Sequence, residues 1–235
     1  MPRSADDRGS GPFEIGVIMY KRTMFALVCA GVAFGQTAPQ KLENDYVRAS
    51  LGSAAPGKKG PMHKHELNRV LIPLDSGLQV QEFENGKSRE NHLKPGDVRW
   101  DPADGMHTSV NAGTAPYRVA ELEIKKPGGG PVSYGEFDPV KVDPKHYQLV
   151  LENNQVRVTR VRFGPKEQGP MHEHLLPRLT VTLTDQAVRL TMPDGSTRDV
   201  RNPAGLMTLA EAAKHSEENL LNAPFEAIMV ELKSR

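Results

Sequence analysis

Six of the eight histidines belong to a pattern that occurs twice, and this pattern is the part of the sequence best suited to chemistry. A His-x-His pair ends the run Gly60 to His65 and returns at the end of the run Gly169 to His174, and a further histidine follows each pair. The six residues are His63, His65, His107, His172, His174 and His215. Imidazole is the commonest metal ligand in proteins, so the pattern indicates metal binding.

Strand geometry explains how such a pattern would gather its ligands. Side chains alternate along a strand with period two, so the two histidines of each pair point to the same face. A third histidine on a neighbouring antiparallel strand would complete a facial set of imidazoles. Such a set is suited to iron, manganese, zinc, nickel or copper, and it leaves open which of these metals binds.

The histidines are part of a longer internal repeat. A spacing of 109 residues relates positions 42–89 to 151–198, and a spacing of 108 relates positions 95–125 to 203–233. Two lobes therefore share one plan. We expect an upstream extension plus signal peptide over 1–35, an N-terminal barrel over 42–125, a linker over 126–146 and a C-terminal barrel over 147–235.

Both lobes have the composition of antiparallel β structure. Short apolar runs such as 69–72 and 180–183 alternate with turns rich in glycine and proline, which is typical of a sandwich or barrel. Asn85-Gly86 and Asp194-Gly195 stand at matched positions and predict a tight hairpin in each lobe. Positions 209–214 favour a helix, but their counterpart 101–106 predicts a turn, so we expect a loop with one helical turn there.

The N-terminal region resembles an export signal. Lys21 and Arg22 precede the apolar stretch 24–33, which is too short to span a bilayer as a helix, and 33–35 offers small residues for cleavage. We therefore expect a periplasmic or secreted protein; a disordered tail or an uncleaved anchor is the alternative. Cys29, the only cysteine, lies inside this stretch, so cleavage would leave neither disulfides nor thiolate ligands.

The charge balance narrows the range of partners. Lysine and arginine number 30 against 29 aspartates and glutamates, so no net field recruits nucleic acid or an anionic membrane. We expect a small-molecule ligand, anionic if the arginines bind it, no nucleic-acid partner, no membrane contact after signal cleavage, and a homo-oligomer as an open possibility.

The spacing of the histidine motifs resembles that of the cupin superfamily. The residues that carry the resemblance are a glycine before the pair, His63, His65, Gly96, Pro102, His107 and Asn111. The C-terminal lobe keeps both motifs' histidines and Asn219 but lacks the proline and glycine turn of its second motif. The resemblance implies an all-β chain of two tandem antiparallel jelly-roll (cupin) barrels, known as a bicupin.

One position departs from the cupin pattern in both lobes. In cupins a glutamate usually follows the second histidine by four or five residues and supplies a fourth ligand, whereas Arg69 and Arg178 stand at the four-residue position. Arginine has no lone pair to donate to a metal. The arginine could bind an anionic substrate beside a three-histidine metal, form a metal-free anion pocket with the histidines, or point out of the barrel into a salt bridge. Glu123 and Glu231 are plausible partners for it.

These features lead to two classes of function. An enzyme would act on a small anionic organic substrate, as an oxygenase if the metal is redox-active or by Lewis-acid chemistry with zinc or manganese. The competing interpretation is a non-catalytic carbohydrate or organic-acid binding protein that uses a histidine and arginine pocket. His92 and His146 have no counterparts, and we expect both at the surface.

Overall fold

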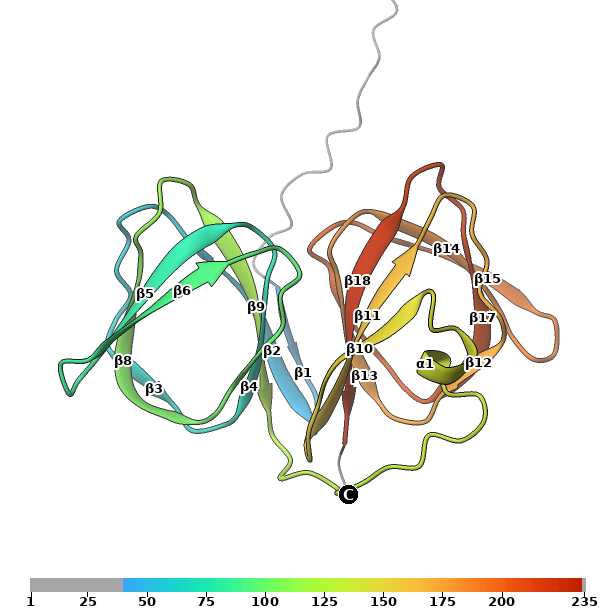
Figure 1. Ribbon diagram of the computed structural model, residues 1–235, viewed down its shortest axis with the longest axis horizontal. Coiled ribbons are helices and arrows are strands. Elements are labelled where there is room, and N and C mark those ends of the chain that lie inside the picture. The colour runs from blue at the N-terminus through green and yellow to red at the C-terminus, as the bar shows by residue number, and fades with distance from the viewer. Residues whose placement is uncertain (1–39, 234–235) are drawn as a thin grey trace, which may run out of the picture. The chain divides into compact units, whose positions relative to one another are not determined.

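The computed structural model describes residues 40–233, and within this range nearly all of the regular secondary structure is β-strand (Figure 1). The predicted signal peptide lies outside the described residues. The short α1 (Pro139–Val142) is the one helix among residues 40–233, and none of the helical structure there is long and apolar enough to cross a membrane.

The N-terminal lobe contains two antiparallel sheets. The first has the order β1-β2-β9-β4-β7 and the second the order β3-β8-β5-β6. The strands are β1 (Lys41–Glu43), β2 (Val47–Ala54), β3 (His63–His65), β4 (Arg69–Pro73), β5 (Gly77–Phe83), β6 (Ser88–Leu93), β7 (Arg99–Asp101), β8 (Asp104–Asn111) and β9 (Tyr117–Ile124).

The C-terminal lobe repeats this plan strand for strand. Its sheets have the orders β10-β11-β18-β13-β16 and β12-β17-β14-β15. The strands are β10 (Tyr147–Glu152), β11 (Val156–Phe163), β12 (His172–His174), β13 (Arg178–Thr182), β14 (Gln186–Thr191), β15 (Thr197–Asn202), β16 (Met207–Ala210), β17 (Ala213–Asn219) and β18 (Phe225–Leu232). The predicted all-β fold of two tandem barrels is confirmed, whereas the exact domain bounds stay predictions.

The two predicted hairpins are present. Gly86 and Gly195 have φ of 77° and 82°, the left-handed conformation that a tight turn requires and that glycine adopts without strain. The expectation of a loop over 209–214 is wrong, because only Glu211 and Ala212 separate β16 from β17. Pairing of both strands with β13 and β12 overrides the weak local preference for helix.

The largest apolar cluster joins the two lobes, and strand alternation explains why. Along β4, Val70 and Ile72 belong to this cluster, while Arg69 and Leu71 line the barrel interior. β13 repeats the pattern, with Leu179 and Val181 in the same cluster. The apolar contact between the lobes thus lies on the outer faces of the five-stranded sheets. A second, smaller apolar cluster, which includes Val188 and Met229, lies inside the C-terminal barrel and lines its cavity.

The linker is ordered against the C-terminal lobe. Asp138 caps α1 by accepting a hydrogen bond from the backbone of Val140. His146 was expected at the surface, but it is only 4% exposed: Asp143 and Glu167 accept from its two ring nitrogens at 2.8 and 3.0 Å, and its ring stacks on Phe163. The expectation was wrong because two carboxylates satisfy the buried ring. His92 is exposed as predicted.

Candidate metal centre

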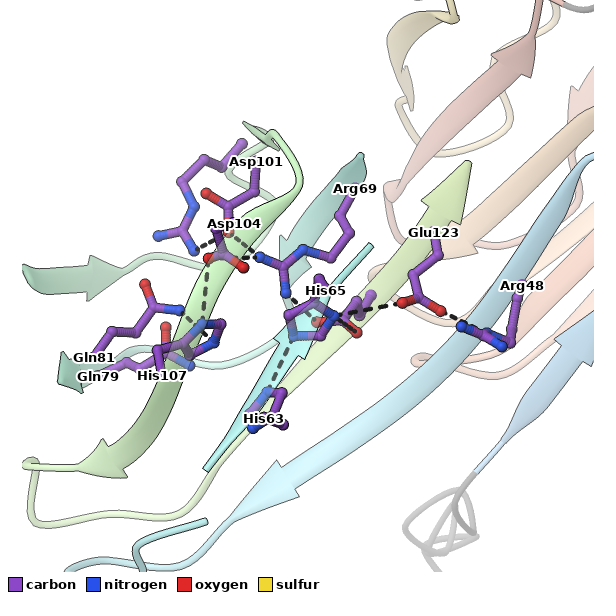
Figure 2. A network of polar contacts seen from close by, with 12 residues as sticks. Arg48, His63, His65, Arg69, Gln79, Gln81, Asp101, Asp104, His107 and Glu123 are labelled. Atoms are coloured by element: carbon purple, nitrogen blue, oxygen red, sulfur yellow. Dashed lines mark hydrogen bonds and ion pairs between the residues drawn. The ribbon is translucent and has the colours of Figure 1, made fainter. Parts of the chain in front are cut away.

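The structure brings the three N-terminal histidines together. His63 and His65 come from β3, and His107 stands opposite His63 on the paired strand β8. The Nε2 atoms of His63 and His65 lie 3.1 Å apart, and one nitrogen from each of the three rings lies within 4.8 Å of the others (Figure 2). Three imidazoles converging at this separation fit a single transition-metal ion.

The opposite nitrogens of these rings are already engaged. The Nδ1–H of His63 donates to the Pro61 carbonyl at 2.9 Å, and that of His107 donates to the Gly105 carbonyl at 3.2 Å. Glu123 accepts from His65 Nδ1 at 3.4 Å. Metal-binding histidines usually donate their outer N–H in this way, which fixes the tautomer and directs the Nε2 lone pair inward. The residues present therefore fit a metal.

The C-terminal lobe contains a second, more deeply buried triad. His172, His174 and His215 are 0%, 2% and 3% exposed, and one nitrogen from each ring again lies within 4.8 Å of the others. The Pro170 carbonyl and Glu231 accept from the Nδ1 atoms of His172 and His174 at 3.0 and 3.4 Å. Burial lowers the pKa of His172, and it lowers the pKa of His174 well below its ordinary value, which favours the neutral form that binds metal.

Arg69 faces the N-terminal cavity and is also paired. Its side chain is 1% exposed, and its guanidinium contacts Asp101 at 2.8 Å, Asp104 at 3.3 Å and Glu121 at 3.5 Å (Figure 2). The expected partner Glu123 instead pairs with Arg48 at 2.5 Å. Arg69 therefore combines two of the arrangements considered from the sequence, because it lies inside the barrel and still forms salt bridges.

Arg178 occupies the matched place in a different environment. It donates to the backbone carbonyl of Glu211, and within the described chain no carboxylate lies within 4 Å of its guanidinium. Burial is the main cause that lowers its pKa, while the charges of Glu217 and Glu231 oppose that effect. Arg178 is thus the less neutralised of the two inward-facing arginines.

Each triad borders a cavity large enough for a small organic molecule. The N-terminal cavity measures about 440 Å³, and its lining includes the three histidines together with Lys58, Arg69, Arg99, Gln79 and Gln81. The C-terminal cavity measures about 500 Å³, and its lining includes His174, His215, Arg178, Tyr147 and Glu217. Both cavities are lined by charged and by apolar side chains.

Several residues of these sites were not identified from the sequence. Asp101 and Asp104 belong to a segment whose composition predicts a turn, so their role as partners of Arg69 has no sequence signal. Glu217 follows His215 by two residues, and period-two alternation would have placed both on one face. Tyr147 lies outside the matched positions of the repeat, and only the fold brings its hydroxyl to 3.2 Å from His172 Nε2.

Comparison with known proteins gives a consistent picture of the fold. No protein-family model matches the sequence, and no curated protein matches it. Among solved structures, AerE from Microcystis aeruginosa is similar with a TM-score of 0.58 and 13% identity, covering 83% of this chain and 97% of that one.

Two further solved structures are similar over most of the chain. Salicylate 1,2-dioxygenase from Pseudaminobacter salicylatoxidans has a TM-score of 0.55 and 12% identity, with 82% of this chain and 76% of that chain covered. Vicilin from Corylus avellana has a TM-score of 0.54 and 11% identity, with 79% and 74% covered. At these identities the likeness establishes the fold.

Proposed function

We propose that this chain, which has the tandem two-barrel fold of the cupin superfamily, is an exported metal-binding protein that acts on a small anionic organic substrate. The observation that carries the proposal is the convergence of three histidine nitrogens in each lobe, with Nδ1 of the five histidines other than His215 hydrogen-bonded to a carbonyl or carboxylate. Export rests on the basic residues and apolar stretch near the N-terminus.

The residues around the N-terminal cavity support an anionic substrate. Lys58, Arg69 and Arg99 line it, against one lining carboxylate, Glu121. Arg69 is enclosed by acidic groups, whereas Arg99 has one carboxylate contact, to Asp101 at 3.5 Å, and its buried Nε has no hydrogen-bond partner. Arg99 is therefore the side chain best placed to bind a carboxylate of the substrate, with its planar donors oriented for such a contact.

The reaction class depends on the metal. Iron, copper or nickel held by three histidines would let oxygen and a substrate bind together, whereas zinc or manganese would polarise a hydroxy or keto acid. The structural likeness to salicylate 1,2-dioxygenase, a mutant of which has been solved in complex with gentisate, supports the oxygenase. The protein's own residues would hold the metal, orient the anion and limit access of water.

A second candidate is a non-catalytic carbohydrate or organic-acid binding protein. The support for it is the neutralisation of Arg69 by three carboxylates and the same fold in vicilin, because one fold hosts many activities. Such a protein would bind sugar acids or phenolic acids without turning them over. Oxygen-consumption assays with small phenols, diketones and sugar acids, run beside binding assays, separate the two candidates.

The first test is metal content. Elemental analysis of protein purified without chelators should give about two equivalents, and His65→Ala and His174→Ala should each lose about one, because each removes a ligand from one centre. His92→Ala is the matched control, since His92 is exposed and outside both triads. Metal content that is unchanged in both triad variants would contradict the proposed centres.

A further inference from the structure

The two histidine centres differ at the strand pair beside the third histidine. In the N-terminal lobe, Gln81 of β5 stands opposite Ser109 of β8. The same position in the C-terminal lobe pairs Leu190 of β14 with Glu217 of β17. The polar group next to the histidines therefore comes from a different strand in each lobe, and it is an amide in one and a carboxylate in the other.

The N-terminal amide is a hydrogen-bond donor to its histidine. Arg89 donates to the Gln81 carbonyl oxygen at 2.9 Å, which orients the amide nitrogen toward His107 Nε2 at 3.4 Å (Figure 2). Because His107 Nδ1 donates to a carbonyl, its Nε2 lone pair faces the triad, and the amide is a neutral donor to that lone pair until a metal takes its place.

The C-terminal carboxylate, unlike the N-terminal amide, has no proton to donate to its histidines. Glu217 Oε1 lies 3.5 Å from His215 Nε2, and Tyr147 donates its hydroxyl proton to Glu217 Oε2 at 2.7 Å. The same hydroxyl oxygen lies 3.2 Å from His172 Nε2, whose ring already donates through Nδ1 to Pro170. One phenolic proton thus faces two acceptors, and His215 Nε2 is a second donor to the carboxylate only in the tautomer that carries its proton there, a form that cannot bind metal through Nε2.

Burial makes it unfavourable in free energy to leave these acceptor atoms without donors or a cation. Tyr147 and His172 are 1% and 0% exposed, and the Glu217 side chain is 15% exposed, so water cannot freely solvate these groups. A buried carboxylate is normally paired with a cation or coordinates a metal. Among the described residues no lysine or arginine lies within 4 Å of the Glu217 carboxylate. A divalent cation would be held first by the three histidines, whose ligand atoms lie within 4.8 Å of one another, and Glu217, which borders this group at His215, would reach the ion by rotating its side chain.

We propose that Glu217 is the fourth protein ligand of the C-terminal centre, oriented by Tyr147, and that it replaces the carboxylate absent at Arg178. The inference rests on the proposed metal-binding function. It makes the two centres chemically unequal: the N-terminal centre is neutral with three histidines, and the C-terminal centre adds a negative charge. The C-terminal centre is then the tighter site for a divalent cation.

The test measures affinity for Co²⁺, whose visible spectrum reports the ligands around the ion. In the full chain carrying His65→Ala, so that only the C-terminal centre remains, Glu217→Gln should weaken Co²⁺ binding at least about 10-fold and change the visible band. Tyr147→Phe should weaken binding less than Glu217→Gln, since it removes only the group that orients the carboxylate.

The reciprocal variant transfers the carboxylate to the other lobe. In the full chain carrying His174→Ala, Ser109→Glu should tighten Co²⁺ binding at the N-terminal centre, and Ser109→Gln, the matched control without charge, should not. This gain cannot arise from misfolding, so it supports the ligand role even if Glu217→Gln were poorly folded. Circular dichroism of every variant checks the fold.

The outcomes separate this inference from the proposed function. Unchanged Co²⁺ affinity and spectrum in folded Glu217→Gln, with metal still bound by the parent, would overturn the ligand role of Glu217 alone. Failure of both parent proteins to bind Co²⁺ would overturn the proposed metal-binding function together with this inference. Equal weakening by Tyr147→Phe and Glu217→Gln, with no change of spectrum, would also contradict direct ligation.

Discussion

Arg48 and Arg157 occupy matched positions in the two lobes, and their surroundings show how the repeat has diverged. Arg48 is 55% exposed and pairs with Glu123 at 2.5 Å. Arg157 is buried, and both of its terminal nitrogens donate to Asp138 of the linker at 2.9 Å. Its distance to Glu231, the counterpart of Glu123, is 3.6 Å.

This difference affects the pKa values of Glu123 and Glu231, each of which contacts the second histidine of a triad. Burial alone would raise the pKa of Glu123, but its contacts with Arg48 and His65 outweigh burial and lower the pKa. For Glu231 burial prevails over the charges of Arg157 and Arg178 and, with a smaller contribution from the negative charge of the linker's Asp138, raises the pKa to about 7. A segment outside the repeat therefore changes the charge behind one histidine triad and not the other.

The largest expected effect comes from removing the buried arginine. Arg157→Met should lower the free energy of unfolding by about 3–5 kcal/mol, because Asp138 is left as an uncompensated buried charge beside Glu231. Urea denaturation followed by circular dichroism measures the change.

Arg48→Met is the matched control for this comparison. Its salt bridge is exposed on the arginine side, so the loss should stay within about 1 kcal/mol. Equal losses in the two variants would mean that the linker contact does not distinguish the lobes.

The sequence predicted the internal repeat but not this difference between the two lobes. The matched histidines predicted two triads because period two and antiparallel pairing follow from residue spacing alone. The partner of Arg157 comes from a linker with no counterpart in the repeat, so no matched position could indicate it. In the same way, the sequence identified Arg69 but not its partners, because the pairing of β4 with β7 brings Asp101 to it and Asp104 comes from the start of β8.

Two matched glycines extend the comparison to packing. A Cβ at Gly169 would lie 2.6 Å from Asp143 Oδ2 and 3.2 Å from the Phe163 ring, and Asp143 is held in place by His146. Gly169→Ala should therefore cost about 1–3 kcal/mol of unfolding free energy, because neither neighbour can move freely.

The counterpart Gly60 has room for a methyl group. The nearest atom to a Cβ there is the Ser109 carbonyl oxygen at 3.7 Å, an ordinary contact. Gly60→Ala should change the unfolding free energy by no more than about 0.5 kcal/mol. Thermal melts of the two variants side by side test the difference, and a larger shift for Gly60→Ala would argue against tighter packing around the C-terminal motif.

The smallest expected effect concerns the linker residue Tyr134 at alkaline pH. Burial, reinforced by the charge of Glu152, raises the pKa of Tyr134, although Arg157, 3.8 Å from the ring centre, opposes the shift. A folded-state pKa above the unfolded value means that the contribution to stability is complete below about pH 10 and is lost as pH rises further. The wild-type chain should therefore lose more stability between pH 8 and pH 10.5 than Tyr134→Phe, measured as urea midpoints. If both proteins lose the same amount, the phenol is not buried by docking of the linker, and the contrast between an enclosed Arg157 and an open Arg48 would have to be explained by Asp138 alone.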